Sequence, residues 1–164
     1  KLAVQYLGAI GIVLVIEPHL PGTLLDGAAM RTADDIAAIG LTLRHDRLDN
    51  FWFTLLHEVA HLMLHIGAGQ FSAIFDDTDA PAHSDVEREA DYFAQEALLP
   101  TAKWHACLSR FSRTEKAVLA DAKKFHISPA IIAGRIRREA GDYTLLRRLV
   151  GAGEPRKQLT RERT

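Results

Sequence analysis

The segment from Phe53 to His65, FTLLHEVAHLMLH, restricts the fold of this chain most, because four titratable side chains interrupt an otherwise apolar run. His57 and His61 are four residues apart, which on an α-helix places them about 6 Å apart along the axis and about 40° apart around it. Their neighbours are leucine, valine, alanine and methionine, so we expect this helix to pack in the core. Since burying two imidazoles without a partner is costly, the pattern predicts that they share one.

A metal ion is the partner that this spacing favours. Two imidazole nitrogens can converge on one zinc ion at about 2.0–2.1 Å each. Glu58 lies beside the first histidine but off the ligand stripe, where it can take a proton from a water molecule that the metal activates. The HExxH pattern therefore predicts one Zn²⁺ ion held by His57 and His61, with Glu58 as general base. Manganese or iron in place of zinc stays open.

A catalytic zinc site also needs a third protein ligand and an open position. A histidine six residues after His61 would supply that ligand in one known class of site, but residue 67 is glycine. His65 lies on the same helix stripe, two turns beyond His57, where all three histidines can hardly reach one ion. We therefore expect His65 to form a hydrogen bond near the helix end or behind a ligand.

The next predicted helix offers a better third ligand. Glu87 and Asp91 are four residues apart and share one face, whereas Glu89 points away from it. Glu87 can bind the zinc ion while Asp91 accepts a hydrogen bond from a ligand imidazole and so orients it. A solvated acidic stripe on an amphipathic helix is the alternative interpretation of these carboxylates.

The remaining pattern predicts an α+β chain. Its 164 residues, 48% hydrophobic and 25% charged, are typical of one soluble globular domain. We expect strands at 12–16, 24–30 and 36–43, and helices within 2–10 and at 51–66, 86–98, 101–111, 113–125 and 129–140. An Asp26-Gly27 turn, a surface loop at 67–85, and helix caps at Asp49-Asn50, Ser112 and Ser128 complete the expected elements.

Three regions are expected along the chain: a core at 1–111, a helical region at 112–150 packed on or beside it, and a flexible tail at 151–164. Charge follows this division, since residues 1–109 hold 6 lysines and arginines against 15 acidic residues and residues 110–164 hold 14 against 6. Residues 120–138 resemble a helix-turn-helix with Arg135, Arg137 and Arg138 on one flank, so contact with DNA is one interpretation. We favour a packed helix pair with a solvated basic face, because no aromatic stacking pattern accompanies the arginines.

The single cysteine, Cys107, excludes an intrachain disulfide and fits a reducing cytosol. The most apolar early stretch, residues 4–16, is too short to cross a membrane, and no signal-peptide cleavage pattern follows it. We therefore expect a cytoplasmic protein without a membrane partner.

The motifs together resemble those of the ImmA/IrrE family of metallopeptidases. The segments HEVAHLMLH (57–65), EREADYFA (87–94) and ALLP (97–100) are similar to the family patterns HELxHxxLH, ExxAN-x-FA and LLxP. Asp91 stands where the family usually has asparagine. The resemblance runs from about residue 11 to residue 138, and residues 49–56 look like the variant in which this domain follows an N-terminal helix-turn-helix domain.

The resemblance implies a zincin-like fold: a small, mainly antiparallel sheet packed on the HExxH helix and a glutamate-bearing helix, with a helix-turn-helix-like C-terminal region. It implies a gluzincin-like site with zinc on His57, His61 and Glu87, and with Glu58 as base. A protein substrate is implied too, namely a helix-turn-helix repressor whose cleavage switches on stress-response or mobile-element genes.

Two questions stay open in the sequence. One alternative function is a sensor or regulatory domain of a DNA-binding regulator that keeps the metal site but has little or no turnover. The donor that would stabilise the oxyanion during hydrolysis is also undecided, since His45, His83 and Tyr92 are nearest in sequence and nothing selects among them.

Overall fold

The computed structural model describes residues 2–19, 21–67, 69, 72–77 and 85–160. Its N-terminal half contains a four-stranded mixed sheet with strand order β1-β3-β2-β4. The strands are β1 (Ile12–Glu17), β2 (Leu25–Arg31), β3 (Ala37–Thr42) and β4 (Ala73–Asp77). β1 runs parallel to β3, whereas β2 pairs antiparallel with both β3 and β4. The chain is thus an α+β protein, and two of the three strand pairings are antiparallel as expected.

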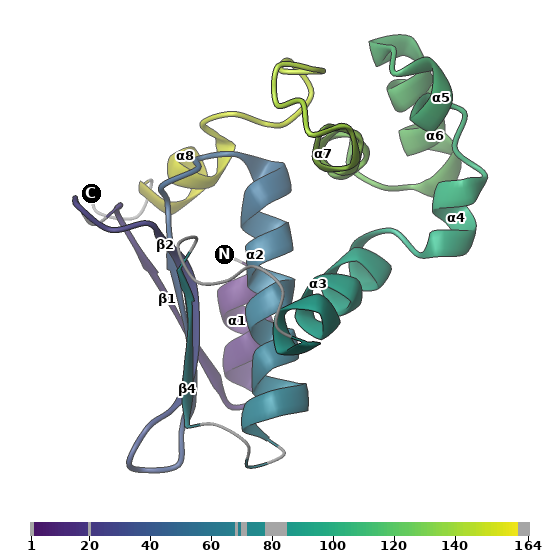
Figure 1. The fold of residues 1–164 in the computed structure, drawn as a ribbon. Coiled ribbons are helices and arrows are strands. Elements are labelled where there is room, and N and C mark those ends of the chain that lie inside the picture. The colour runs from purple at the N-terminus through teal and green to yellow at the C-terminus, as the bar shows by residue number, and fades with distance from the viewer. Residues whose placement is uncertain (1, 20, 68, 70–71, 78–84, 161–164) are drawn as a thin grey trace.

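One long helical segment packs on this sheet. Helix α2 (Leu48–Ala60) continues without a break into η1 (His61–Ile66), a wider π-helical turn in which the amide of Gly67 donates to the carbonyl of Leu62 five residues earlier. Leu55, Leu62 and Ile66 form a buried cluster with sheet residues that include Ala29 and Ile39. Helix α1 (Leu2–Ala9) lies on the same side of the sheet (Figure 1).

The C-terminal half is helical and has its own core. It contains α3 (Asp85–Leu98), α4 (Thr101–His105), α5 (Ser109–Ser112), α6 (Glu115–Phe125), α7 (Pro129–Ala140) and α8 (Glu154–Thr160). Trp104, Val118, Ile132 and Ile136 are buried together there. Trp52 of α2 packs against both this cluster and the one under the sheet. The two cores therefore meet along α2, and the division into a core and a helical region stays a prediction.

Two strand predictions need correction. Asp26-Gly27 does not form a turn, because β2 passes through both residues, with only an irregularity in its pairing to β4 between Leu25 and Gly27. The expected loop at 67–85 contains strand β4, whose apolar stretch is too short to be distinguished in the sequence. β4 exists because β2 offers it an unpaired edge, and such non-local pairing is invisible to local patterns.

Two helix starts also differ from expectation. α2 begins at Leu48, without a side-chain cap, because the carbonyls of Val150 and Gly151 accept hydrogen bonds from its first amide. The cap of α6 is Thr114, whose hydroxyl accepts from the amide of Ala117, while the predicted cap Ser112 ends α5. The cap of α7 is confirmed, since Ser128 accepts from the amide of Ala130.

Part of the segment expected to be a flexible tail is helical. α8 follows a bridge between Ala152 and Arg47, and the amide of Arg156 donates to the carboxylate of Asp46 at 2.9 Å. Residues 161–164 lie outside the described residues. Within the described part of the chain, no helix is both long and apolar enough to cross a membrane.

Candidate metal centre

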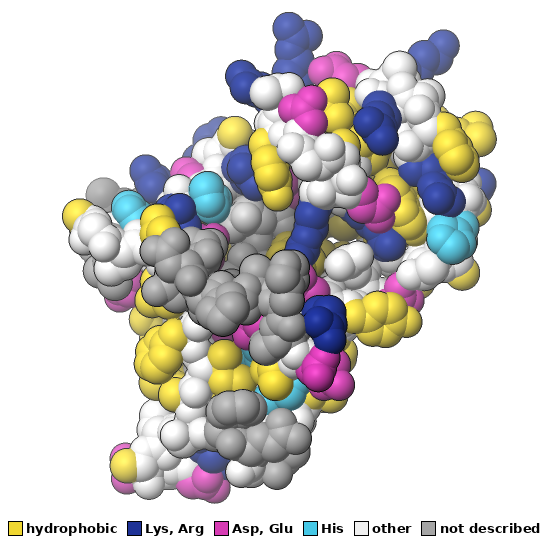
Figure 2. Space-filling view, in the orientation of Figure 1, with side chains coloured by type: hydrophobic (Ala, Val, Ile, Leu, Met, Phe, Trp, Pro, Cys, Tyr) yellow, Lys and Arg dark blue, Asp and Glu magenta, His cyan; other side chains and the backbone are white. Residues whose placement is uncertain are grey.

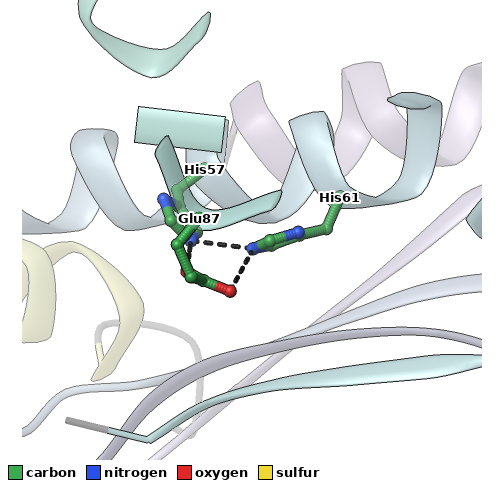
Figure 3. A group of neighbouring side chains, drawn as sticks. All are labelled: His57, His61 and Glu87. Carbon is green, nitrogen blue, oxygen red and sulfur yellow. Dashed lines mark hydrogen bonds and ion pairs between the residues drawn. The ribbon is translucent and has the colours of Figure 1, made fainter. Parts of the chain in front are cut away.

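His57 and His61 lie on the inner side of α2 and η1, where the helix faces α3. Both are buried, with 4% and 0% of their surface exposed. Their Nε2 atoms are 2.8 Å apart and point toward one another (Figure 3). The rings meet edge to face, as expected for two imidazoles one turn apart that aim at a common point.

Glu87, in the first turn of α3, completes this group. Its Oε2 lies 3.1 Å from His57 Nε2, and its Oε1 lies 3.6 Å from His61 Nε2 (Figure 3). α3 can approach α2 closely because two of its inward positions are the fully buried alanines Ala90 and Ala94. When Nε2 of His57 and of His61 carries a proton in place of a metal ion, the hydrogen bonds to this carboxylate, that of His57 first, hold the pKa of Glu87 far below its ordinary value.

These three side chains fit a divalent metal ion. Among the described residues, His57, His61 and Glu87 form the group whose ligand atoms all lie within 4.8 Å of one another, and we refer to these three residues as the ligand group. Tetrahedral ligands at zinc distances of about 2.0–2.1 Å are separated by about 3.3 Å, and the contacts above, at 2.8, 3.1 and 3.6 Å, bracket that spacing. Three lone-pair donors converging in a buried position need a cation to offset their desolvation.

Asp91 holds His57 in the tautomer that a metal requires. The Nδ1–H of His57 donates to Asp91 Oδ1 at 3.1 Å, which leaves the lone pair of Nε2 facing the ligand group. The other oxygen of Asp91 accepts a hydrogen bond from Arg138 on α7. Arg138 also stacks over the ring of Phe53, 4.1 Å from its centroid. The carboxylate is therefore fixed from two sides.

His65 and Glu89 fix the tautomer of His61 through a chain of two hydrogen bonds. His65 Nε2 lies 3.2 Å from the carboxylate of Glu89, so that nitrogen carries the proton and donates it. His65 Nδ1 is then an acceptor for the Nδ1–H of His61, 3.0 Å away, and His61 Nε2 keeps its lone pair. His65 thus lies behind a ligand, as expected. The contact of Glu89 with His65 was not predicted, because it depends on how α3 docks on η1.

Glu58 is fully buried and packs against β2. The strand and the Glu58 side chain are so close at Gly27 that no side chain fits between them. A β-carbon built at Gly27 would lie 2.9 Å from both Cγ and Cδ of Glu58. The predicted general base is thus enclosed between α2 and the sheet, beside the first histidine of the ligand group.

A cleft of about 390 Å³ opens next to the ligand group, with His57 and Glu87 in its wall. Most of its wall comes from α2, α3 and α7, with Phe75 of β4 and Tyr143 after α7, and its apolar residues also include Phe53, Leu98 and Ile131. Charged residues in the wall are paired: Arg47 with Asp49 and Arg135 with Glu139, each at 3.0 Å, and Arg138 with Asp91. The cleft therefore opens onto the predicted metal position.

The three arginines predicted to form a basic flank on α7 are engaged within the molecule. Arg135 donates to the carbonyl of Leu99 at 2.7 Å, Arg137 is buried near Asp49, and Arg138 binds Asp91. Figure 2 shows lysine and arginine side chains over the C-terminal helices on this face of the molecule. The arginines that suggested DNA contact therefore make contacts within the described part of the chain.

The structure separates the candidates for oxyanion stabilisation. Tyr92 is 66% exposed and lines a different groove, with Leu64 and Phe93. His45 lies 4.0 Å from Asp26, a residue of the cleft wall, and burial lowers the pKa of this imidazole. His83 lies outside the described residues.

Comparison with known protein families agrees with this geometry. Residues 12–137 match the IrrE N-terminal-like domain of the M78 peptidases. The match covers most of the chain and includes all the residues of the ligand group, so this chain belongs to the M78 family and is a metallopeptidase. No curated protein matches the chain.

Proposed function

We propose that this protein is a zinc-dependent endopeptidase with His57, His61 and Glu87 as metal ligands and Glu58 as general base. The observation that carries the proposal is the convergence of three buried or half-buried donor atoms, two of them with tautomers fixed by hydrogen bonds. A site with three protein ligands leaves a position open for chemistry, whereas structural zinc sites are usually closed by four.

The proposed role of each residue follows from its position relative to the metal ligands. A bound metal would supply Lewis acidity, polarising the scissile carbonyl and activating the attacking water. Glu58 accepts the proton of that water and returns it to the leaving amine. Asp91 and His65 hold the two imidazoles, and the cleft beside His57 and Glu87 holds the extended substrate.

The proposed substrate is a protein. Following the resemblance of the motifs, we propose a helix-turn-helix transcriptional repressor, whose cleavage in the cytoplasm would switch on stress-response genes. The cleft supports a peptide ligand in general terms, since its wall combines apolar side chains with charges that are already paired.

Two variants test the proposal together. Glu58→Gln keeps the shape of the side chain and all three ligands, so it should retain metal while cleavage of candidate repressors falls about 10²–10⁴-fold. Glu87→Gln should lose metal and activity together. Metal content is measured by elemental analysis and cleavage by mass spectrometry of the products. Equal cleavage by Glu58→Gln and the parent would contradict the enzymatic role. A parent protein that binds metal but cleaves no candidate repressor would support the sensor alternative.

A further inference from the structure

Gly27 lies where the sheet comes nearest to the HExxH helix. A β-carbon at this position would lie 2.9 Å from Cγ and from Cδ of Glu58, and nearer still to Oε1. Favourable contacts between carbon atoms need about 3.5–4.0 Å. The three nearest atoms all belong to Glu58, so a methyl group at position 27 meets that side chain before anything else.

The backbone conformation of Gly27 does not itself require glycine. The glycines with positive φ are Gly11, Gly22, Gly69, Gly141, Gly151 and Gly153, and Gly27 is not among them. It pairs regularly with Leu41 of β3, in the middle of the sheet. The reason for glycine at this position is therefore the close approach of Glu58 and not a turn.

Glu58 has no room to retreat from an added methyl group. Its side chain is fully buried between α2 and β2, and Ala28 and Ala29, the next two residues of the strand, are buried as well. To restore an ordinary contact from 2.9 Å, the Glu58 side chain or the strand would have to move by at least about 0.6 Å, and the nearer Oε1 atom requires more. Catalytic groups generally need to be held within about 0.5 Å of their working position.

We propose that Gly27 is a positioning residue for Glu58: the missing side chain leaves the space that sets where the general base lies beside the metal ligands. This inference rests on the proposed role of Glu58 as base. The candidate ligands contact one another and are held by Asp91 of α3 and His65 of η1, so we expect the space at Gly27 to govern the base and to leave the ligand group unchanged.

The test compares Gly27→Ala with a matched glycine of the same sheet. Gly40 of β3 has no atom within 4 Å of its ideal β-carbon, so Gly40→Ala adds the same methyl group to a strand without a clash. Gly27→Ala should cleave a repressor or model peptide about 10- to 100-fold more slowly while binding Zn²⁺ with parental affinity. Gly40→Ala should match the parent in both. Loss of Zn²⁺ binding by Gly27→Ala, or equal cleavage by both variants, would overturn the inference.

A double-mutant cycle on stability tests the close packing of Gly27 and Glu58 without measuring activity. Glu58→Ala removes all three atoms that the methyl group would meet, so Gly27→Ala should lower the denaturation midpoint in the parent but not in the Glu58→Ala background. The double variant also covers the case in which Gly27→Ala alone does not fold. If the double variant fails to fold as well, the methyl group meets something else and the inference is wrong. If the parent cleaves nothing but the cycle shows coupling, the proposed function fails while the packing relation stands.

Discussion

The guanidinium of Arg138 binds the carboxylate of Asp91, and this contact joins the C-terminal helices to the candidate metal site. Asp91 in turn accepts from His57, so a residue of α7 helps to fix an imidazole of the candidate metal site on α2. The C-terminal region therefore helps to position a side chain of the candidate site, in addition to forming a core of its own.

Replacing Asp91 should weaken metal binding. Asp91→Ala removes the acceptor for His57 Nδ1–H, and the loss of such a partner typically costs 10- to 100-fold in metal affinity. Asp91→Asn is the matched control, because its carbonyl oxygen can still accept that hydrogen bond. Competition titration with a chelator measures both affinities. Parental affinity in Asp91→Ala would show that His57 needs no such support.

His65 should matter for both metal binding and stability, because it contacts His61 from outside the ligand group. His65→Leu leaves the Nδ1–H of His61 buried without an acceptor, which should cost about 1–3 kcal/mol of unfolding free energy. Metal affinity should fall but not vanish, in contrast to His61→Ala. Chemical denaturation and metal titration test the two effects. Complete loss of metal in His65→Leu, with the fold intact, would indicate that His65 itself binds the ion.

Glu96 predicts a dependence of stability on pH. Its carboxylate accepts hydrogen bonds from the hydroxyl and the amide of Thr101 at the start of α4, and these lower the pKa of Glu96 from its ordinary 4.5. A carboxyl whose pKa is lowered by folding stabilises the protein above the unfolded value and loses that contribution as the pH falls through the folded value. Glu96→Gln should therefore be less stable than the parent near pH 7, and the difference should shrink below pH 4.5. A constant difference from pH 7 to pH 3 would argue against this account.

Gly134 on α7 should tolerate no side chain, contrary to helix propensity. An alanine inside a helix is ordinarily about 0.5–1 kcal/mol more favourable than glycine. A β-carbon at Gly134, however, would lie 2.6 Å from Cβ of Asp49, where α7 crosses α2. Gly134→Ala should therefore be destabilising, whereas Gly8→Ala in α1, with open space around it, should not be. Thermal unfolding of the two variants decides the point, and stabilisation by Gly134→Ala would contradict the close packing of α7 on α2.

The sequence was sufficient to find the residues that converge. Spacing alone located His57 and His61, and the shared helix face of Glu87 and Asp91 led to the third member of the group and its neighbour. Family membership and the α+β class are confirmed as well. All of these depend on local periodicity or on motifs within one helix.

Features that depend on contacts between distant segments were not predictable in this way. β4 forms because β2 has a free edge, and α2 starts at Leu48 because the chain returns there near Val150. The contacts of Arg138 with Asp91 and of Glu89 with His65 need the docking angles of α7 and α3, which no local pattern encodes. Gly27 was assigned to a turn for the same reason: its partner, Glu58, is far away along the chain.

The ligand group takes two members from the segment α2–η1 and one from α3, so the site depends on the contact between these two helical segments. Detachment of α3 alone would dismantle the site while leaving the sheet and α2 folded, so activity would end before the protein unfolds. Conversely, an ion that binds only the assembled group would link α3 to α2. At a free ion concentration of a hundred times its dissociation constant, it would add about 2.7 kcal/mol to the stability of the assembled state. The supply of metal would then set the lifetime of the enzyme as well as its rate.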